Sequence, residues 1–378
     1  MTTLLSELTT LRVGGPAERL VQATTRESLV GTVLEDWANG EDPLILGGGS
    51  NMLAADEGFD GTVVQVATRG IERLESVPGR VRLRVEAGES WDDLVAFAVG
   101  NGWSGIEALS GIPGSSGAAP IQNIGAYGQE LESVLVSVDL LDRDLHEVVR
   151  VQAEELALGY RTSVLKRHGG SVPERDGVVV AIELDLADDA GLSAPIAYAQ
   201  LANALGVELG TRLPIADVRH SVLELRSSKG MVLDPADPDT SSAGSFFTNP
   251  IVSEAFARSL PADAPRWPIT ESSDPALVIP LGEWDGTVPA PAGSPSFEHD
   301  AQVKLSAAWL IERAGIRRGF RLPGSRAGIS TKHTLALTNT GGATADEIAA
   351  LARFVQARVA AEFGVVLQPE PVFVGVSL

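Results

Sequence analysis

The stretch GIPGSSGAAPIQNIGAYGQ, residues 111–129, contains five glycines and no charged residue in a chain that is acidic elsewhere. Glycine has no Cβ and adopts positive φ readily, so such a loop lets backbone N–H groups converge on an anion or press against a flat ring. A second glycine-rich segment, GGGSN at 47–51, follows an apolar run that predicts a buried strand. Each loop alone is typical of a tight turn, but two in one half of the chain favour a bound ligand.

The two glycine loops do not match the common phosphate-transfer loops. No lysine precedes Lys166, whereas a Walker loop needs a lysine on the phosphates. Neither loop has the GxGxxG spacing of a simple dinucleotide fold. The loops also carry neutral hydrogen-bonding side chains, namely Ser50, Asn51, Ser115, Ser116, Gln122 and Asn123. Such loops suit a pyrophosphate together with an isoalloxazine ring, which needs donors at its edge and close contact on its faces.

Composition excludes several classes of protein. The chain has 378 residues, 44% of them hydrophobic, and a formal net charge of −21, which argues against a nucleic-acid or anionic-membrane partner. It has no cysteine, so disulfides, thiolate metal sites and cysteine nucleophiles are excluded. The five histidines show no HxH or HExxH spacing, and we expect no metal site. Since no apolar run is long enough for a membrane span or a signal peptide, we expect a cytoplasmic protein.

The first half of the chain alternates predicted helices and strands. Residues 25–40 place Leu29, Val33 and Trp37 on one face of a helix, and residues 61–70 and 80–90 read as strands. Ser90 and Asp93 then form a capping-box pattern before another amphipathic helix. This alternation indicates mixed α and β layers.

The second half is richer in turn residues. Segments 234–244 and 277–300 read as long exposed loops, and Lys304 reads as the start of a helix. Thr344 and Glu347 form a capping box for a final long helix that Gly364 should end, and a terminal strand should follow over 365–375.

Six motifs together resemble one enzyme family. They are RVGGPA (12–17), LGGGSNML (46–53), GIPGSSGAAPIQNIGAYG (111–128), YRTSVLK (160–166), AGSFFTNP (243–250) and LQPEPVFVG (367–375). In this order they resemble the UDP-N-acetylenolpyruvoylglucosamine reductases, flavoenzymes that complete UDP-N-acetylmuramate for peptidoglycan. The match covers nearly the whole chain, and the second glycine loop and GSFFTNP are its most specific parts.

The resemblance implies an α+β fold with a two-lobed FAD-binding domain of the vanillyl-alcohol-oxidase type and a C-terminal α+β substrate-binding domain. The expected parts are 1–68 with 365–378, then 69–230 with an insertion loop near 193–205, and then 231–364. The expected ligands are FAD, NADPH as hydride donor, and UDP-N-acetylglucosamine enolpyruvate. Because neither glycine loop contains a histidine, we expect FAD to be bound non-covalently, and we expect the protein to be a monomer.

The resemblance also assigns binding residues. Those expected to contact FAD are Gly47, Gly48, Gly49, Ser50, Asn51, Gly111, Ile112, Gly114, Ser115, Ser116, Gly117, Gln122, Asn123, Gly125 and Tyr127. Those expected to contact the substrate are Tyr160, Tyr198, Lys229, Asn249 and Lys304. For Lys304 a solvated surface position is an equally good interpretation. Four arginines within 316–326 are able to bind a diphosphate or the NADPH 2′-phosphate, or to form a solvated basic loop.

Three residues fit the chemistry of reducing an enolpyruvyl ether, which places enolate charge beside a carboxylate. Arg161 offers a fork of donors to both groups. Ser245 is the expected proton donor to carbon. Glu370, in the apolar terminal segment, should have a pKa raised by burial and donate to the developing oxyanion.

Two other functions remain open from the sequence. One is an FAD-dependent alcohol or sugar oxidase of the same fold, and the other is a non-catalytic nucleotide-sugar-binding protein. The combination of Arg161, Ser245 and Glu370 argues against both.

Overall fold

A computed structural model describes residues 3–167, 172–269 and 301–378. The chain divides into two compact units. The first contains Met1–Phe246, Arg317–Phe354 and Glu370–Leu378, and the second contains Phe247–Ile316 and Val355–Pro369. The predicted loop at 277–300 lies outside the described residues, and the three domain ranges expected from the sequence stay a prediction.

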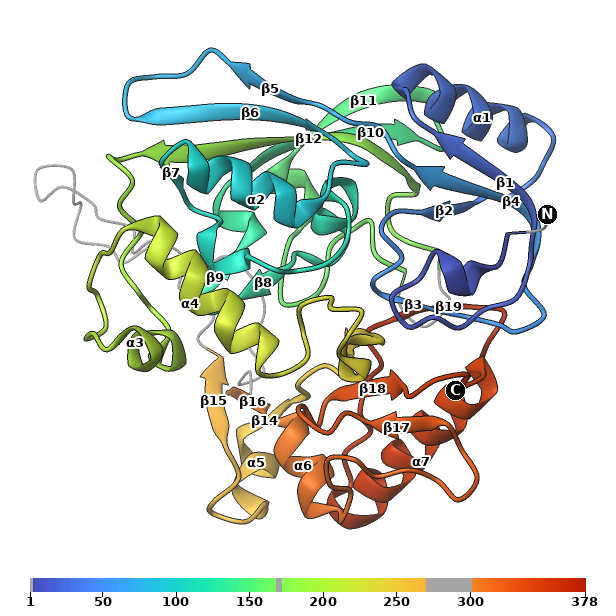
Figure 1. Cartoon of the computed structure of the whole chain (residues 1–378), viewed down its shortest axis with the longest axis vertical. Coiled ribbons are helices and arrows are strands. Elements are labelled where there is room, and N and C mark those ends of the chain that lie inside the picture. The colour runs from blue at the N-terminus through green and yellow to red at the C-terminus, as the bar shows by residue number, and fades with distance from the viewer. Residues whose placement is uncertain (1–2, 168–171, 270–300) are drawn as a thin grey trace, which may run out of the picture. The chain divides into compact units, whose positions relative to one another are not determined.

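The first unit begins with a small parallel sheet of order β1-β4-β2 and the helix α1 that packs on it (Figure 1). The elements are β1 (Ala17–Ala23), α1 (Arg26–Ala38), β2 (Leu44–Leu46) and β4 (Phe59–Val66). Thr25 caps α1, since its side chain accepts a hydrogen bond from the Ser28 amide. Leu29 and Val33 are buried in one cluster with residues of β4, which confirms the predicted helix and its inward face.

The largest sheet of the first unit has the strand order β11-β10-β12-β6-β5, with β7 pairing to β12. These strands are β5 (Ile71–Leu74), β6 (Arg80–Glu86), β7 (Trp103–Ser104), β10 (Leu135–Asp142), β11 (Glu147–Gln152) and β12 (Gly177–Asp188). Helix α2 (Trp91–Gly100) covers one face of it (Figure 1). The Ser90 side chain accepts a hydrogen bond from the Asp93 amide at the start of α2, as the capping pattern predicts.

Short elements around the second glycine loop complete this region. They are the 3₁₀ helices η2 (Glu107–Leu109), η3 (Ser116–Gln122), η4 (Leu131–Ser133) and η5 (Ala153–Leu156) and the hairpin of β8 (Gly125–Ala126) and β9 (Gln129–Glu130). Helices α3 (Ala199–Leu205) and α4 (Ile215–Ser227) follow and pack on each other. The glycine loop is therefore enclosed by regular structure.

The prediction that 234–244 is an exposed loop was wrong for its second half. After the 3₁₀ helix η6 (Pro238–Thr240), β13 (Ser242–Ser245) joins a sheet with β18 (Ala336–Asn339) and β17 (Ala327–Ile329), and residues 239–243 are buried. These polar residues can be buried because their polar groups are hydrogen-bonded within the protein. Asp239, for example, accepts a hydrogen bond from the Thr331 amide at 2.8 Å. A turn-rich composition does not by itself imply exposure.

The second unit contains a three-stranded antiparallel sheet and short helices. The elements are β14 (Ile251–Ser253), α5 (Glu254–Ser259), β15 (Arg266–Ile269), β16 (Gln302–Leu305) and α6 (Ala307–Arg313). The helix predicted to begin at Lys304 was wrong, because Lys304 lies in β16 and α6 begins after Ser306. Val303 and Leu305 are both buried two positions apart, which is the period of a strand.

The C-terminal part contains the long helix α7 (Ala345–Phe363), whose residues up to Phe354 belong to the first unit. The Thr344–Glu347 capping box is present in both directions, at 3.1 Å each, and Gly364 has a φ of 70° beyond the last turn. Both predictions are confirmed.

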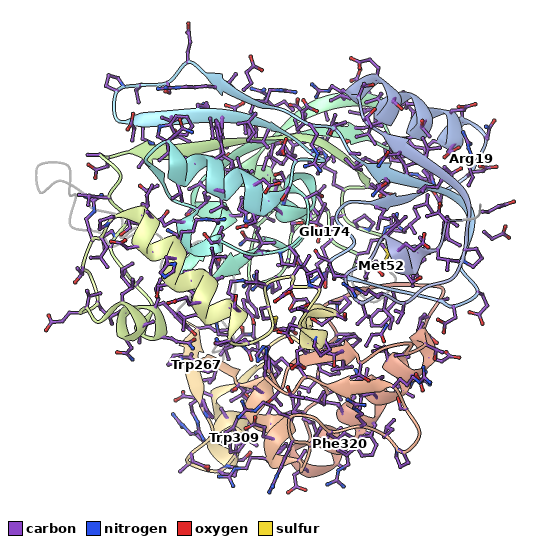
Figure 2. All side chains as sticks on the ribbon, in the orientation of Figure 1. Arg19, Met52, Glu174, Trp267, Trp309 and Phe320 are labelled. Carbon is purple, nitrogen blue, oxygen red and sulfur yellow. The ribbon has the colours of Figure 1, made fainter. Side chains whose placement is uncertain are left out.

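The terminal strand is shorter than the sequence predicts. Only β19 (Val372–Val374) is a strand, pairing in parallel with β3 (Met52–Ala54), which Met52 marks in Figure 2. Pro369 and Pro371 flank Glu370, and proline has no N–H to give to a ladder. Glu370 therefore precedes the strand instead of lying within it.

Within the described residues, no helix is long and apolar enough to cross a membrane.

Candidate active site

The two glycine loops lie directly against each other. A Cβ on Gly48 would lie 2.7 Å from the Gly114 Cα, and one on Gly47 would lie 2.4 Å from the Ser115 Oγ. The Ser50 hydroxyl donates to the Pro113 carbonyl at 2.9 Å. The glycines, which have no side chain, therefore allow the two loops to approach each other closely.

Both loops keep backbone donors available. Among the described residues, no group accepts a hydrogen bond from the amides of Gly48, Gly49, Ser50 or Ser115. The Ser116 hydroxyl is buried and also has no partner among the described residues. Adjoining unpaired N–H groups form a site for an anion such as a pyrophosphate, and a buried hydroxyl without a partner is costly unless a ligand satisfies it. These residues fit FAD.

Several other predicted FAD residues pack or form hydrogen bonds within the protein and so hold the second glycine loop in place. Gly117 has no space for a Cβ, which would lie 2.5 Å from that of Ala87, and the Gly111 amide donates to the Asp92 carboxylate at 2.6 Å. Ile112 packs on the core under the large sheet, as do several neighbours of Gln122. Gly125 begins β8, where a Cβ would press on the Glu130 side chain at 2.8 Å.

The structure brings Arg161 and Glu370 together from distant parts of the chain. The Arg161 Nε lies 3.4 Å from the Glu370 Oε1, and the other guanidinium nitrogens donate to the carbonyls of Asn123 at 3.2 Å and Gly125 at 2.8 Å. Burial raises the pKa of the Glu370 carboxyl, while Arg161 and Lys166 oppose that shift. The carboxyl is thus biased towards its protonated form although two cations lie near it.

Ser245 lies at the end of β13 and is joined to Glu370 through the next residue. The Glu370 amide donates to the Phe246 carbonyl at 2.9 Å. The Ser245 hydroxyl lies 3.4 Å from the His333 Nε2, within hydrogen-bonding distance. Arg161, Ser245 and Glu370 therefore belong to one connected region of the first unit.

Two tyrosines and a lysine predicted as ligand residues form a second group. The rings of Tyr127 and Tyr198 meet edge to face with centroids 5.9 Å apart, and the Lys229 ammonium lies 5.6 Å from the Tyr127 ring centre. Lys229 donates to the Gln200 side chain at 3.1 Å. Burial and the nearby Arg226 both lower the pKa of Lys229. Among the described residues, no carboxylate lies within ion-pair distance of Lys229 or Arg226, so this group has positive charge available for an anion.

The other predicted substrate residues are placed by their local partners. The Arg161 guanidinium lies 5.8 Å from the Tyr160 ring centre in the first unit. In the second unit, the Asn249 side-chain oxygen accepts a hydrogen bond from the Ala307 amide at 2.9 Å and caps α6. Lys304 pairs with Ile251 and Trp267 across the sheet.

Three residues that lie in these groups have no role in the predictions made from the sequence. Lys166 donates to the Arg161 carbonyl at 2.8 Å, His333 contacts Ser245, and the buried Nε of Arg226 has no hydrogen-bond partner among the described residues. Two sequence signals point to Lys166: the scarcity of lysine, four against twenty-five arginines, and its place at the end of the YRTSVLK motif. No pattern in the sequence singles out His333 or Arg226.

The first unit also contains a cavity of about 840 Å³. None of the predicted catalytic, FAD or substrate residues lines it. Its lining includes Arg80, Gly128, Glu130, Asp185 and Arg212. Since Arg80 pairs with Asp185 and Arg212 with Asp189, its arginines are already neutralised.

Comparisons with known proteins agree with this geometry. Residues 17–152 match the model of an FAD binding domain, and residues 235–374 match that of the UDP-N-acetylenolpyruvoylglucosamine reductase C-terminal domain. The UDP-N-acetylenolpyruvoylglucosamine reductase of Leifsonia xyli is 58% identical, over 99% of this chain and 98% of its own. That of Saccharopolyspora erythraea is 51% identical, over 99% and 95%.

The chain belongs to the UDP-N-acetylenolpyruvoylglucosamine reductase family. A crystal structure of the Thermus caldophilus reductase matches 99% of this chain and 98% of its own, with a TM-score of 0.59 and 26% sequence identity. The resemblance inferred from the six motifs and the expected α+β fold, with an FAD-binding part and a C-terminal domain of the family, are confirmed. This member of the family is an FAD-containing oxidoreductase that acts on a small molecule.

Proposed function

We propose that the chain is an NADPH-dependent flavoenzyme that reduces UDP-N-acetylglucosamine enolpyruvate to UDP-N-acetylmuramate. The observation that carries the proposal is the Arg161–Glu370 pair beside the Ser245 strand, in the same unit as the two glycine loops. The product is a precursor of peptidoglycan, so the role is in cell-wall biogenesis, cell shape and cell division. The monomeric state and the cytoplasmic location stay predictions.

Arg161 is arranged to bind the carboxylate end of the substrate. FAD held by the two glycine loops would supply hydride transfer from NADPH to the vinyl carbon of the substrate, so that negative charge would develop on the adjacent carbon and its carboxylate. Of the five N–H groups of the Arg161 guanidinium, two donate to the Asn123 and Gly125 carbonyls and the Nε–H lies beside the Glu370 carboxyl, with 3.4 Å between Nε and Oε1. Two remain, among the described residues, for the carboxylate and the developing charge.

Ser245 is the proposed proton donor to that adjacent carbon. The proton leaves the Ser245 Oγ as the new C–H bond forms, and the oxygen is left as an alkoxide that must regain a proton from solvent. The His333 Nε2, 3.4 Å away, is placed to stabilise the hydroxyl orientation and to return a proton.

Glu370 supplies the second proton-bearing group. Burial raises the pKa of its carboxyl and so favours the protonated form, and Arg161 and Lys166 stabilise the carboxylate once that proton is shared with the developing oxyanion.

The group of Tyr127, Tyr198 and Lys229 is proposed to hold the diphosphate of the sugar nucleotide. Its support is the positive charge of Lys229 and Arg226, neither of which forms an ion pair within the described residues, in a chain whose net charge is −21. Asn249 and Lys304, in the second unit, remain proposed substrate residues on the resemblance alone.

The visible absorption spectrum of the purified protein tests the proposal directly. We expect a flavin band that NADPH bleaches without oxygen and that UDP-N-acetylglucosamine enolpyruvate then restores. A colourless protein that FAD cannot reconstitute contradicts the flavin assignment. Rapid peroxide formation in air, with no response to the enolpyruvyl substrate, would instead identify an oxidase.

A further inference from the structure

Lys166 is a half-buried cation to which the sequence assigns no task and which the proposed mechanism uses only as a charge near Glu370. It follows the YRTS segment by three residues, and its ammonium donates to the Arg161 carbonyl at 2.8 Å. The same ammonium lies 3.4 Å from the Gln122 Oε1. Among the described residues, no carboxylate lies within ion-pair distance of this ammonium. Lys166 is therefore not part of an ordinary surface ion pair.

The contacts of Lys166 are part of a closed ring of residues from four chain segments. From Gln122, the ring continues to Asn51, whose Nδ2 donates to the Gln122 Oε1 at 3.2 Å. Asn51 also donates to the Glu370 carbonyl at 3.3 Å. The Glu370 carboxyl, 3.4 Å from the Arg161 Nε, closes the ring. Lys166 therefore joins the predicted FAD residues Asn51 and Gln122 to both Arg161 and Glu370.

Arg161 needs such support because its backbone is strained. Its φ is 57°, in the left-handed region that a bulky residue rarely adopts. A conformation of this kind persists only where the surroundings hold it on several sides. The guanidinium is held by the Asn123 and Gly125 carbonyls, but the peptide carbonyl of Arg161 is held by Lys166. Release of that carbonyl would allow the backbone to relax and carry the guanidinium away from its position.

The chemistry of the site explains why the residue is a lysine. A compact ammonium with three donors can reach a carbonyl and an amide oxygen in different directions, whereas the planar fork of arginine fixes its donors in one plane. Burial lowers the pKa of Lys166, Glu370 raises it, and Arg161 lowers it. The charged groups facing the Glu370 carboxyl are Arg161 and Lys166.

We propose that Lys166 is a positioning residue, which holds the left-handed Arg161 backbone in place and keeps a second cation beside Glu370. The proposal rests on the proposed function, because it concerns how Arg161 and Glu370 are presented to the substrate carboxylate. Two consequences follow. Loss of the ammonium should misplace Arg161, and it should also raise the pKa of Glu370, since one of the two opposing cations is gone.

The test compares Lys166→Met, which keeps the length of the side chain, with Lys166→Arg, which keeps the charge. The matched control is Arg167→Met, which removes the cation next in the sequence. Arg167 is exposed and forms an ion pair with Asp176. Stopped-flow absorbance measures the two half-reactions separately: bleaching of the flavin by NADPH and its reoxidation by UDP-N-acetylglucosamine enolpyruvate, the latter across a range of pH.

For Lys166→Met we expect reoxidation by substrate to slow by roughly 10²-fold, the size of effect that a small misplacement of a catalytic group produces. Bleaching by NADPH should stay within about twofold of wild type, since Arg161 and Glu370 are proposed to act on the substrate and not on NADPH. The rate of reoxidation should fall at alkaline pH, where Glu370 gives up its proton. This alkaline limb of the pH–rate profile should lie at higher pH in Lys166→Met than in the wild type. In Lys166→Arg the alkaline limb should stay at the wild-type position while the rate recovers only in part. Arg167→Met should match wild type.

Three results overturn the proposal. The first is a pH–rate profile whose alkaline limb does not move in Lys166→Met. The second is an equal slowing of both half-reactions in Lys166→Met. The third is a shift of the alkaline limb in Arg167→Met as large as that in Lys166→Met. If Lys166→Met does not fold, Lys166→Arg provides the test. A wild-type rate of reoxidation in Lys166→Arg would show that the geometry of the ammonium is not required and would contradict the proposal. If the wild-type protein itself is not reoxidised by the substrate, the proposed function fails and the role of Lys166 fails with it.

Discussion

At the scale of single residues, the candidate site depends on groups whose protonation or conformation is held away from its ordinary state. Burial raises the pKa of Glu370 against the effect of two cations, and Arg161 keeps a φ of 57°. Such departures are typical of functional sites, because structural stability alone would favour relaxed groups. Each can be tested by one substitution.

Ser245→Ala should slow reoxidation of the flavin by UDP-N-acetylglucosamine enolpyruvate by roughly 10²- to 10⁴-fold, the usual effect of removing a positioned acid. The NADPH half-reaction should stay near normal, because Ser245 is proposed to act only on the substrate carbon. Stopped-flow absorbance of both half-reactions makes the measurement. A variant slowed equally in both would exclude Ser245 as the proton donor.

At the scale of elements, the architecture depends on loops and helices that are tied to one another by close contacts. The loop at 47–51 follows β2 and lies against the loop at 111–115, which precedes η3. Helix α1 is tied to the large sheet by Asp139 of β10, which receives hydrogen bonds from Arg26 of α1 and from Arg84 of β6. The contact between the two loops fixes where their amides lie.

Gly48→Ala should weaken FAD binding by at least about tenfold. Its Cβ would lie 2.7 Å from the Gly114 Cα, and backbone cannot move aside as a flexible side chain can. Overpacking typically costs about 1–3 kcal/mol, and ~1.4 kcal/mol is a factor of ten in affinity. Quenching of flavin fluorescence on titration measures the dissociation constant.

The matched control is Gly31→Ala within α1, where a Cβ would meet nothing within 4 Å. It should leave FAD affinity unchanged and stabilise the protein by about 0.5–1 kcal/mol through helix propensity. Equal affinities for FAD in the two variants would show that the contact between the loops does not shape the site.

Asp139→Asn should lower the free energy of unfolding by about 2 kcal/mol at neutral pH. That is less than the ~3–5 kcal/mol for breaking a fully buried pair, since the Arg26 side chain is 33% exposed. Burial raises the pKa of Asp139, but hydrogen bonds from Arg26 and Arg84 outweigh this and hold it below the ordinary value. The stabilisation is therefore present above the unfolded pKa of ~3.9 and is lost as pH falls through the lower folded pKa.

Urea unfolding of the two proteins at about pH 7 and about pH 3 checks this, because the gap between them should narrow at the lower pH. Asp144→Asn, at an exposed position beyond the end of β10, is the control and should behave as wild type at both. A gap that is constant with pH would mean that the charge of Asp139 is not what stabilises the contact.

At the scale of the whole molecule, the chain is strongly acidic but binds ligands that are themselves anionic. The predicted ligand groups supply local cations within a net charge of −21, namely Arg161, Lys166, Arg226 and Lys229. The four arginines predicted as a possible phosphate site, Arg317, Arg318, Arg321 and Arg326, are exposed. Their role stays a prediction.

Removal of FAD should destabilise the folded chain. A ligand that binds only the native state adds about 2.7 kcal/mol to the free energy of unfolding at a free concentration of ~100 times its dissociation constant. Urea unfolding of the apoprotein, with and without added FAD, measures the difference. The gain at the same FAD concentration should be smaller in Gly48→Ala, and identical midpoints for the wild-type protein with and without FAD would contradict a native FAD site.

The sequence alone determined the local features: the helix over 26–38, the caps at Ser90 and Thr344, the glycine loops and the family. Each depends on neighbours a few residues apart, on side-chain periodicity or on a missing Cβ. Only the tertiary structure decided that Glu370 meets Arg161, that the two glycine loops touch, and that Lys166 is a half-buried cation in the site. It also placed Lys304 in a strand and buried residues 239–243. The reason is that burial and long-range pairing depend on partners that no local pattern names.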